Sequence, residues 1–282
     1  MSARAPTATD AEPGPVSRAL ARADALSLLT NGRIDVEGRI VDASNATLYA
    51  QVELDGVVSH CVYKPVAGER PLWDFPDGTL GQREVAAFVV CEAMGLELIP
   101  PTVWREDGPF GPGMCQLWIE TDDSVELVDI VERGRKRAGW HTVLRAYGND
   151  GSPVVLVHAD DARLQTMALM DAVINNADRK GGHILVDGNG DLFGVDHGVC
   201  FNLDEKLRTV LWGWAGAPLR DEDSDRLARL SSDLDRAAGT ELATLLTSRE
   251  IRATRQRITR LQTARSYPLP AEGWPAIPWP AF

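Results

Sequence analysis

The stretch NNADRKGGHILVDGNGDLFGVDHGVCF, residues 175–201, carries the densest cluster of acidic and imidazole side chains in the chain. Within it, HILVD and LFGVD flank a Gly-Asn-Gly turn at residues 188–190, which predicts a short β-hairpin. A hairpin returns its second strand beside its first. We therefore expect Asp196, at the far end of the hairpin, to lie near Asp178 and His183 in the preceding loop.

Two carboxylates and an imidazole that converge on one loop can hold a divalent metal and supply a general base. The alternative is a pair of ordinary polar turns, in which Asn, Asp and Gly are common. The spacing DGNGD does not make an EF-hand, because Leu192 stands where that loop needs glycine and no glutamate closes it.

The flanking segments predict further elements. Residues 33–66 alternate apolar and polar side chains and predict strands, with Asp55-Gly56 as a hairpin turn. GQREVAAFVVCEAMG, residues 81–95, has the apolar spacing of a helix that ends at Gly95, and two strands follow near residues 101–104 and 114–119. LQTMALMDAVINN, residues 164–176, is apolar nearly all round and predicts a buried helix.

The order of these elements predicts an α+β protein with a β-rich N-lobe that contains one helix and a larger, mainly helical C-lobe. We expect the N-lobe at residues 17–120 and the C-lobe at 121–265, which turns helical from about residue 122 and carries two amphipathic helices around residues 227–234 and 251–261. Residues 1–16 predict a disordered tail. Residues 266–282, rich in Pro and Trp, predict an extended tail whose tryptophans dock on the body, or alternatively a ligand for a partner.

The composition excludes several classes of function. Forty-one acidic against 29 basic residues give a formal charge of -12, so we expect no binding to nucleic acid and no adsorption to an anionic membrane. No apolar run has the length of a signal peptide core or a membrane span. The four cysteines are far apart in apolar stretches and predict buried free thiols in a cytoplasmic protein: Cys61, Cys91, Cys115 and Cys200.

A second cluster lies in the N-lobe. Lys64 belongs to the apolar strand CVYKPV, and Glu84 to the helix that follows it. In phosphotransferases such an ion pair positions the lysine on nucleotide phosphates; the alternative is a solvated surface lysine. The polar turn at residues 42–47 has amides and hydroxyls that could cover phosphate oxygens, although it lacks the glycines of a nucleotide loop.

Taken in order, these features resemble the phosphatidylinositol 3-/4-kinase-like superfamily, and most closely the type II phosphatidylinositol 4-kinases and their bacterial relatives. The resemblance covers residues 38–235. Its segments are VYKPVAGERP (62–71), GQREVAAFVVCEAMGLELIPPT (81–102), CQLWIE (115–120), NADRKGGH (176–183), VDHGVCF (195–201) and TVLWGWAGAPL (209–219).

The resemblance implies a two-lobed protein-kinase-like fold that binds ATP with Mg²⁺ or Mn²⁺. It implies that Lys64 binds the phosphates with Glu84 as its partner. The residues implied to cover the phosphates are Ser44, Asn45 and Thr47. The hinge, whose backbone would pair with adenine, is implied at Gln116, Leu117, Trp118 and Ile119. The transfer and metal residues implied are Asp178 as catalytic aspartate, Arg179 beside the transferred phosphoryl group, Asp196 as main metal ligand and His183 as second metal ligand.

Three features depart from the family pattern. His183 replaces the usual asparagine, and imidazole is a poorer ligand for Mg²⁺ and a better one for Mn²⁺ or Zn²⁺. His197 is interpreted as a packed histidine rather than a catalytic one. The segment ERPLWDFPDGTL, residues 69–80, lacks the cysteine-rich palmitoylated patch of the type II lipid kinases.

The basic run at residues 133–137 could contact an anionic acceptor or form a solvated surface.

The leading hypothesis is an ATP-dependent phosphotransferase with nucleotide bound between the lobes. Its acceptor is then a hydroxyl group of a protein, which includes the enzyme itself, of a small metabolite or, least favoured, of an inositol lipid. One alternative is a catalytically silent pseudokinase that binds nucleotide or a partner. A third hypothesis is nucleotidyl transfer, which the same residues could support.

Overall fold

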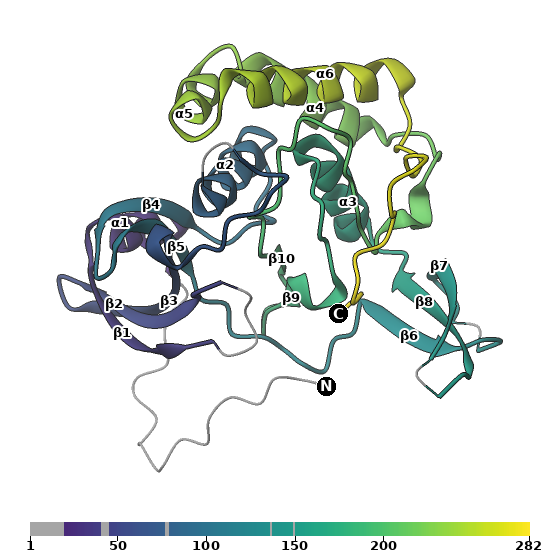
Figure 1. Cartoon of the computed structure of the whole chain (residues 1–282), viewed down its shortest axis with the longest axis horizontal. Helices are drawn as coiled ribbons and strands as arrows, with labels where there is room; N and C mark the ends of the chain where they lie inside the picture. The colour runs from purple at the N-terminus through teal and green to yellow at the C-terminus, as the bar shows by residue number, and fades with distance from the viewer. Residues whose placement is uncertain (1–19, 41–44, 77–78, 136, 149) are drawn as a thin grey trace. The chain divides into compact units, whose positions relative to one another are not determined.

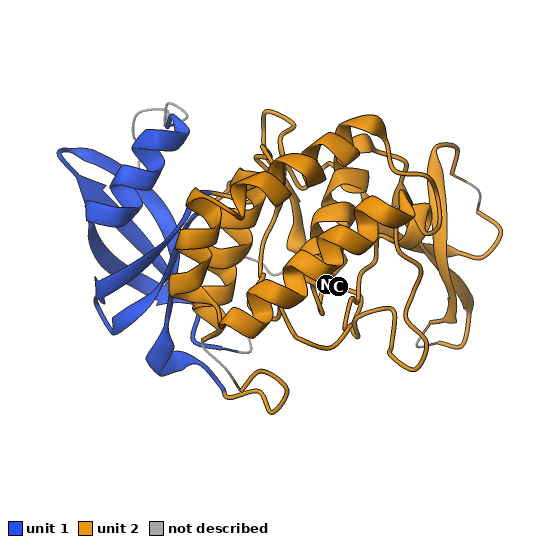
Figure 2. Cartoon of the chain, turned by 90° about the horizontal axis from the view of Figure 1, so that it is seen from above, with its two compact units in different colours: residues 1–70, 101–118 blue, residues 71–100, 119–282 orange. Residues whose placement is uncertain are grey.

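The computed structural model describes residues 20–40, 45–76, 79–135, 137–148 and 150–282. The chain divides into two compact units, residues 1–70 with 101–118 (unit 1) and residues 71–100 with 119–282 (unit 2) (Figure 2). The predicted tail at residues 1–16 lies outside the described residues, and so do Ser44 and Lys136. The boundaries of the two units differ from those of the predicted lobes. Residues 71–100 are predicted in the N-lobe (17–120) but belong to unit 2.

Unit 1 is built on a five-stranded antiparallel sheet of order β1-β2-β3-β5-β4. Its strands are β1 (Arg33–Arg39), β2 (Leu48–Leu54), β3 (Val57–Pro65), β4 (Thr102–Gly108) and β5 (Gly111–Leu117). Asp55 and Gly56 both have positive φ and form the predicted turn, beside which Leu54 pairs with Val57. The strands predicted in residues 33–66 and near residues 101–119 are confirmed.

One helix, α1 (Arg22–Asn31), packs on this sheet. Leu28 and Leu29 join a core with residues of the first three strands and of β5. The buried guanidinium of Arg105 on β4 donates to the carbonyls of Leu29 and Gly32 at 2.8 and 2.9 Å and so holds the end of α1. Among the described residues of unit 1, the one α-helix is therefore α1, which the sequence pattern does not predict, and not the helix predicted at residues 81–95.

Unit 2 contains the other α-helices of the described residues, which are labelled in Figure 1. They are α2 (Leu80–Ala93), α3 (Ala162–Ile174), α4 (Asp221–Asp233), α5 (Ala237–Leu245) and α6 (Ser248–Ala264). Thr79 and Gln82 form a capping box at the start of α2, and Gly95 follows its end with positive φ, as predicted. Helix α3 is buried on almost every side, as predicted, and α4 and α6 are the two predicted amphipathic helices.

The prediction that the chain turns mainly helical from residue 122 is wrong for residues 128–159. They form an antiparallel sheet of β6 (Val128–Glu132), β8 (Pro153–Ala159) and β7 (Trp140–Tyr147), in that spatial order. The central strand carries the apolar run VVLV, and Val131, Val155 and Val157 form a small core against Trp140. A short apolar run of this kind has no helical period. As strand β8, it pairs with β6 on one side and with β7 on the other. The predicted hairpin is confirmed as β9 (Ile184–Val186) and β10 (Leu192–Gly194).

His158 on β8 is a fully buried histidine where this sheet meets the short 3-10 helix η3 (Trp212–Trp214). Its Nε2 accepts from the amide of Gly213 at 2.9 Å, and its Nδ1 lies 2.8 Å from the carbonyl of Ala159. This pair of bonds requires the neutral ring with its proton on Nδ1. Burial lowers the pKa of His158 to about 4.

Acidification from pH 7.5 to pH 5 is expected to cost about 2 kcal/mol of unfolding free energy through His158 alone. The unfolded ring binds a proton near its ordinary pKa of about 6.5, whereas the folded ring does so only near about 4. The contribution of His158 to the free energy of unfolding is therefore fully present above the pKa of the unfolded ring. It is lost as the pH falls toward the pKa of the folded ring. Urea unfolding at both pH values, for the natural chain and for His158→Gln, measures this loss. Gln keeps an acceptor for the amide of Gly213 but does not titrate. If both chains lost the same unfolding free energy on acidification, the loss would not come from His158.

Candidate active site

The loop after α3 begins at Asn175, which ends the helix in the left-handed conformation at φ 54° and is fully buried. Its Nδ2 donates to the carbonyls of Asn202 and Asp204 at 3.0 and 2.6 Å, and its Oδ1 accepts from the amide of Lys206 at 2.9 Å. These three bonds join the loop to residues 202–206. The direction in which the chain leaves α3 is thereby fixed.

Arg179 is fully buried in this loop. Its Nε and Nη2 each lie 2.9 Å from a carboxylate oxygen of Asp171, its Nη1 donates to the carbonyls of His183 and Val195, and its Nη2 lies 2.6 Å from Nε2 of His197. The prediction that Arg179 lies beside a transferred phosphoryl group is wrong, because its guanidinium is closed off by these partners. Arg179 instead joins the loop to α3 and to the hairpin. His197, also fully buried, is a packed histidine as interpreted from the sequence.

Asp178 is the partly exposed carboxylate of the loop. Its backbone amide donates to Oδ1 of Asn176 at 2.9 Å, and Nδ2 of Asn176 donates to Asp171. Its carboxylate forms a 3.0 Å ion pair with Lys180. The backbone under Asp178 is therefore held by buried side chains, while its carboxylate reaches solvent and can accept a proton or a hydrogen bond from a hydroxyl group.

The hairpin brings Asp196 next to His183, as predicted. Nε2 of His183 lies 3.4 Å from Oδ2 of Asp196, and the amide of Val195 donates to the carbonyl of His183 at 3.0 Å. The Asp196 side chain is half exposed, and its φ of 61° is a conformation that Asp and Asn adopt more readily than most residues. Burial lowers the pKa of His183, although the Asp196 carboxylate acts in the opposite direction.

A divalent cation fits this pair only as part of a shared site. Across the described residues, no group of three or more His, Cys, Asp or Glu side chains is arranged to hold a metal ion. Asp196 and His183 supply one carboxylate and one imidazole, which together suit Mn²⁺ better than Mg²⁺. The remaining ligands of a cation here would come from phosphate oxygens and water.

Glu84 lies on α2 and is buried in unit 2. A Cβ built on Gly198 would lie 3.7 Å from its Oε1, so Glu84 is near the segment that carries Asp196. Arg83 fixes α2 in this unit: its Nη2 lies 2.6 Å from Oε1 of Glu250 on α6, and its Nη1 donates to the carbonyl of Cys200 at 2.9 Å. The sequence pattern gave no signal for the pair of Arg83 and Glu250, because 167 positions separate them.

Lys64 lies on β3 in unit 1, opposite Met114 of β5. The neighbouring side chain of Tyr63 is buried, so Lys64 points to the other face of the sheet. The described part of the predicted phosphate-covering turn is tied to the segment after β3. Oδ1 of Asn45 accepts from the amide of Arg70 at 2.9 Å, and Thr47 is buried.

The predicted hinge contacts need correction. Nε2 of Gln116 donates to Oγ1 of Thr102 at 2.8 Å inside unit 1. The amide of Leu117 donates to the carbonyl of Pro101 at 2.9 Å, and the amide of Trp118 to that of His60 at 3.0 Å. These two backbone amides are therefore already bonded within unit 1 and are not available to pair with adenine. Of the four predicted hinge positions, Ile119 is the one that belongs to unit 2.

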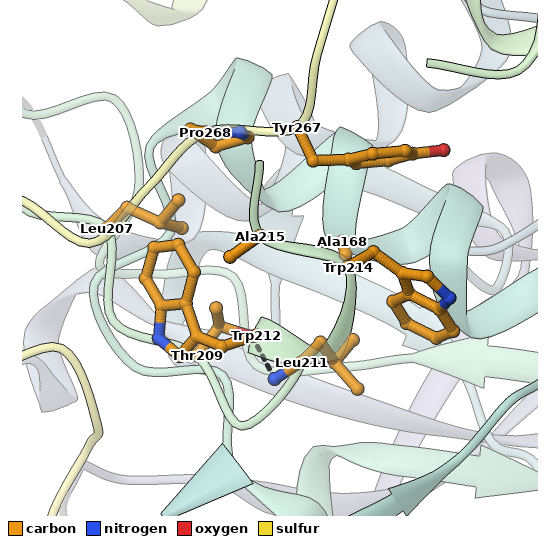
Figure 3. Close-up of a pocket in the computed structure, with 9 residues that line it drawn as sticks. All are labelled: Ala168, Leu207, Thr209, Leu211, Trp212, Trp214, Ala215, Tyr267 and Pro268. Carbon is orange, nitrogen blue, oxygen red and sulfur yellow. Dashed lines mark hydrogen bonds between the residues drawn. The ribbon is translucent and has the colours of Figure 1, made fainter. Parts of the chain in front are cut away.

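A small cavity lies in unit 2 beneath the start of the C-terminal tail (Figure 3). Its space of about 10 Å³ is enough for about one water molecule and excludes a nucleotide. Its lining residues are Ala168, Leu207, Thr209, Leu211, Trp212, Trp214, Ala215, Tyr267 and Pro268.

Two further predictions concern the cysteines and the membrane. All four cysteines are free and buried, as predicted, and burial raises the pKa of the Cys200 thiol. In the part of the chain that the structure describes, no helix has both the length and the apolar character to cross a membrane.

A known protein matches nearly the whole length of the chain. No model of a known protein family matches the chain. It is 48% identical over 270 residues to protein Rv2133c of Mycobacterium tuberculosis (strain ATCC 25618 / H37Rv), a match that covers 93% of this chain and 96% of that protein.

The fold is similar to those of solved kinases. A crystal structure of the Golgi casein kinase matches 86% of this chain and 74% of its own with a TM-score of 0.54 at 15% identity. The same kinase with Mn/ADP bound matches 93% and 80% with a TM-score of 0.55 at 15% identity. The structure of hydra Fam20 with sugar matches 88% and 89% with a TM-score of 0.55 at 16% identity. The chain therefore has the predicted two-lobed, kinase-like α+β fold.

Proposed function

The chain belongs to the family of protein Rv2133c, and from its kinase-like fold we propose that it is an ATP-dependent phosphotransferase. The observation that carries the proposal is the juxtaposition of Asp196 and His183, 3.4 Å apart, next to the loop that presents Asp178. In a kinase fold, an acceptor-side aspartate and a cation-holding aspartate are the two carboxylates that phosphoryl transfer requires.

The proposed roles follow from the chemistry of each side chain. On the resemblance alone, we propose that Lys64 binds phosphate oxygens and that Glu84 supports this role. Asp196 and His183 would hold a divalent cation, which neutralises phosphate charge when bound. Asp178 orients the accepting hydroxyl group and takes its proton. The resemblance to the phosphatidylinositol 3-/4-kinase-like superfamily supports these assignments, and the solved Golgi casein kinase with Mn/ADP supports Mn²⁺ and ATP as partners.

The acceptor class follows from charge and composition. We propose a hydroxyl group of a protein or a small metabolite, and we rank an inositol lipid last because the formal charge of -12 opposes an anionic membrane surface. The same charge opposes nucleic acid as a partner. Four free, buried thiols support the cytoplasm as the location.

Lys64→Ala is expected to weaken ATP binding about 10- to 100-fold, because a hydrogen bond to a charged group contributes about 1.5–3 kcal/mol. Calorimetric titration of ATP, with Mg²⁺ and then with Mn²⁺, measures the affinity of the natural chain and the variant. Arg33→Ala is the matched control, since Arg33 is an exposed cation of the same unit that pairs with Asp35 and Glu53. Equal affinity in the natural and Lys64→Ala chains would overturn the assigned role of Lys64.

A silent, nucleotide- or partner-binding pseudokinase is the second candidate function. One observation favours it: His183 stands where the resemblance places the second metal ligand, usually an asparagine. Against it, Lys64, Glu84, Asp178 and Asp196 all match the family motif. Nucleotidyl transfer would use the same residues and differs in its nucleotide product.

A further inference from the structure

The Pro- and Trp-rich tail, residues 266–282, leaves the end of α6 (Figure 1), contacts residues 206–212 and reaches Gly181. Nε1 of Trp274 donates to the carbonyl of Lys206 at 3.2 Å. The carbonyl of Ala276 accepts from two donors, the amide of Thr209 at 3.0 Å and Nε1 of Trp212 at 2.8 Å. The predicted docking of the tail is confirmed for Trp274, whereas Trp279 is 82% exposed.

The end of the tail reaches the catalytic loop itself. The amide of Gly181 donates to the carbonyl of Ala281 at 2.8 Å. The ring of Phe282 covers Gly181 so closely that a Cβ built there would lie 2.3 Å from the ring. Gly181 is three residues beyond Asp178. Residues 281–282 therefore contact the same loop that carries Asp178.

We propose that Gly181 and residues 206–212 form a binding site for an extended polypeptide, that residues 274–282 occupy it, and that the phosphoryl acceptor is a polypeptide segment that replaces them. This inference rests on the proposed function, because it assigns the acceptor of that same site. The contacts at Ala276 and Ala281 are made to backbone carbonyls, which any extended peptide presents at regular intervals.

The tail binds as a substrate would but cannot react as one. Residues 268–282 contain no Ser, Thr or Tyr, so the bound segment offers no hydroxyl group. In the transfer, the hydroxyl oxygen of the incoming peptide bonds to the γ-phosphorus of ATP. The bond from that phosphorus to the β,γ-bridging oxygen breaks, ADP leaves, and the hydroxyl proton passes to the Asp178 carboxylate. The tail therefore competes with the acceptor for the site.

Phe282→Ala in the full chain tests the site by weakening the tail. Its ring is about half buried, and loss of that contact at about 1 kcal/mol corresponds to about a 5-fold change. A fluorescein-labelled peptide of residues 272–282, followed by anisotropy without ATP, is expected to bind Phe282→Ala about 5-fold more tightly than the natural chain. Leu269→Ala, an exposed residue of the same tail at 70%, is the control and should match the natural chain.

The second readout is transfer from ATP to a mixture of Ser-, Thr- and Tyr-containing peptides. Phe282→Ala should lower KM about 5-fold without a change in kcat. If ATP is consumed but the labelled peptide binds neither chain, the peptide site is overturned and the proposed function stands. If the peptide binds as expected but neither chain binds ATP, the proposed function fails and the acceptor role falls with it. Should Phe282→Ala not fold, Trp274→Phe, which removes the Nε1 donor to the carbonyl of Lys206 and keeps an aromatic ring beside the Lys206 ammonium, carries the same two expectations.

Discussion

Asp196→Asn is expected to lower kcat/KM for phosphoryl transfer from ATP on the order of 10³-fold, with the fold unchanged. The substitution removes the one carboxylate that lies beside His183 and is half exposed, and so the negative charge that would hold a cation. The backbone should tolerate the change, because Asn adopts the φ of 61° found at this position about as readily as Asp.

The control for this substitution is Asp191→Asn. Asp191 is an exposed carboxylate of the same hairpin, so its replacement makes the same change in net charge away from His183. Steady-state kinetics on the three chains, with circular dichroism to verify folding, separates catalysis from stability. Activity of Asp196→Asn within a few-fold of the natural chain would remove Asp196 from the site. Calorimetry adds a second readout, since the metal dependence of ATP affinity should disappear as well.

Arg179→Met is expected to reduce the free energy of unfolding by about 3–5 kcal/mol, because it leaves the Asp171 carboxylate buried without its cation. Both side chains have zero exposure, and Asp171 also accepts from Asn176, which holds the backbone amide of Asp178. Urea unfolding measures the loss. The double variant Arg179→Met/Asp171→Leu should be less destabilised than the single one, because it removes the unpaired charge.

A surface pair provides the comparison for Arg179. Arg163 on α3 pairs with Asp161 at 2.6 Å, and its side chain is 46% exposed. Arg163→Met should therefore cost less than about 1 kcal/mol. If Arg179→Met cost no more than this control, Arg179 would not be the structural anchor of the loop, and a role at the phosphoryl group would have to be reconsidered.

The parts of the fold that depend on local chemistry could be predicted from the sequence. Turn residues at 55–56 and 188–190 specify two hairpins, and the apolar run at residues 164–174 specifies a buried helix. The approach of Asp196 to His183 follows from the second hairpin, because strand pairing alone brings its two ends together.

The parts that depend on tertiary contacts could not be predicted. Arg179 next to Asp178 looks like a site residue in sequence, and its burial depends on Asp171, eight positions earlier on a helix. A signal was nevertheless present, since an aspartate inside an almost wholly apolar helix requires a buried partner. Helix α1 has only Ala25, Leu28 and Leu29 buried, so its apolar period is weak and its position depends on Arg105 of a distant strand.

The nucleotide product formed from ATP tests the central claim most directly. The natural chain, Asp196→Asn and His183→Asn are incubated with ATP, Mg²⁺ or Mn²⁺ and the mixture of Ser-, Thr- and Tyr-containing peptides as acceptor, and the nucleotides are separated by ion-exchange chromatography. A phosphotransferase predicts ADP from the natural chain, with turnover lost in Asp196→Asn. AMP as the product would contradict transfer of the terminal phosphate, and unchanged ATP with the natural chain but ADP with His183→Asn would show that the natural protein is catalytically silent.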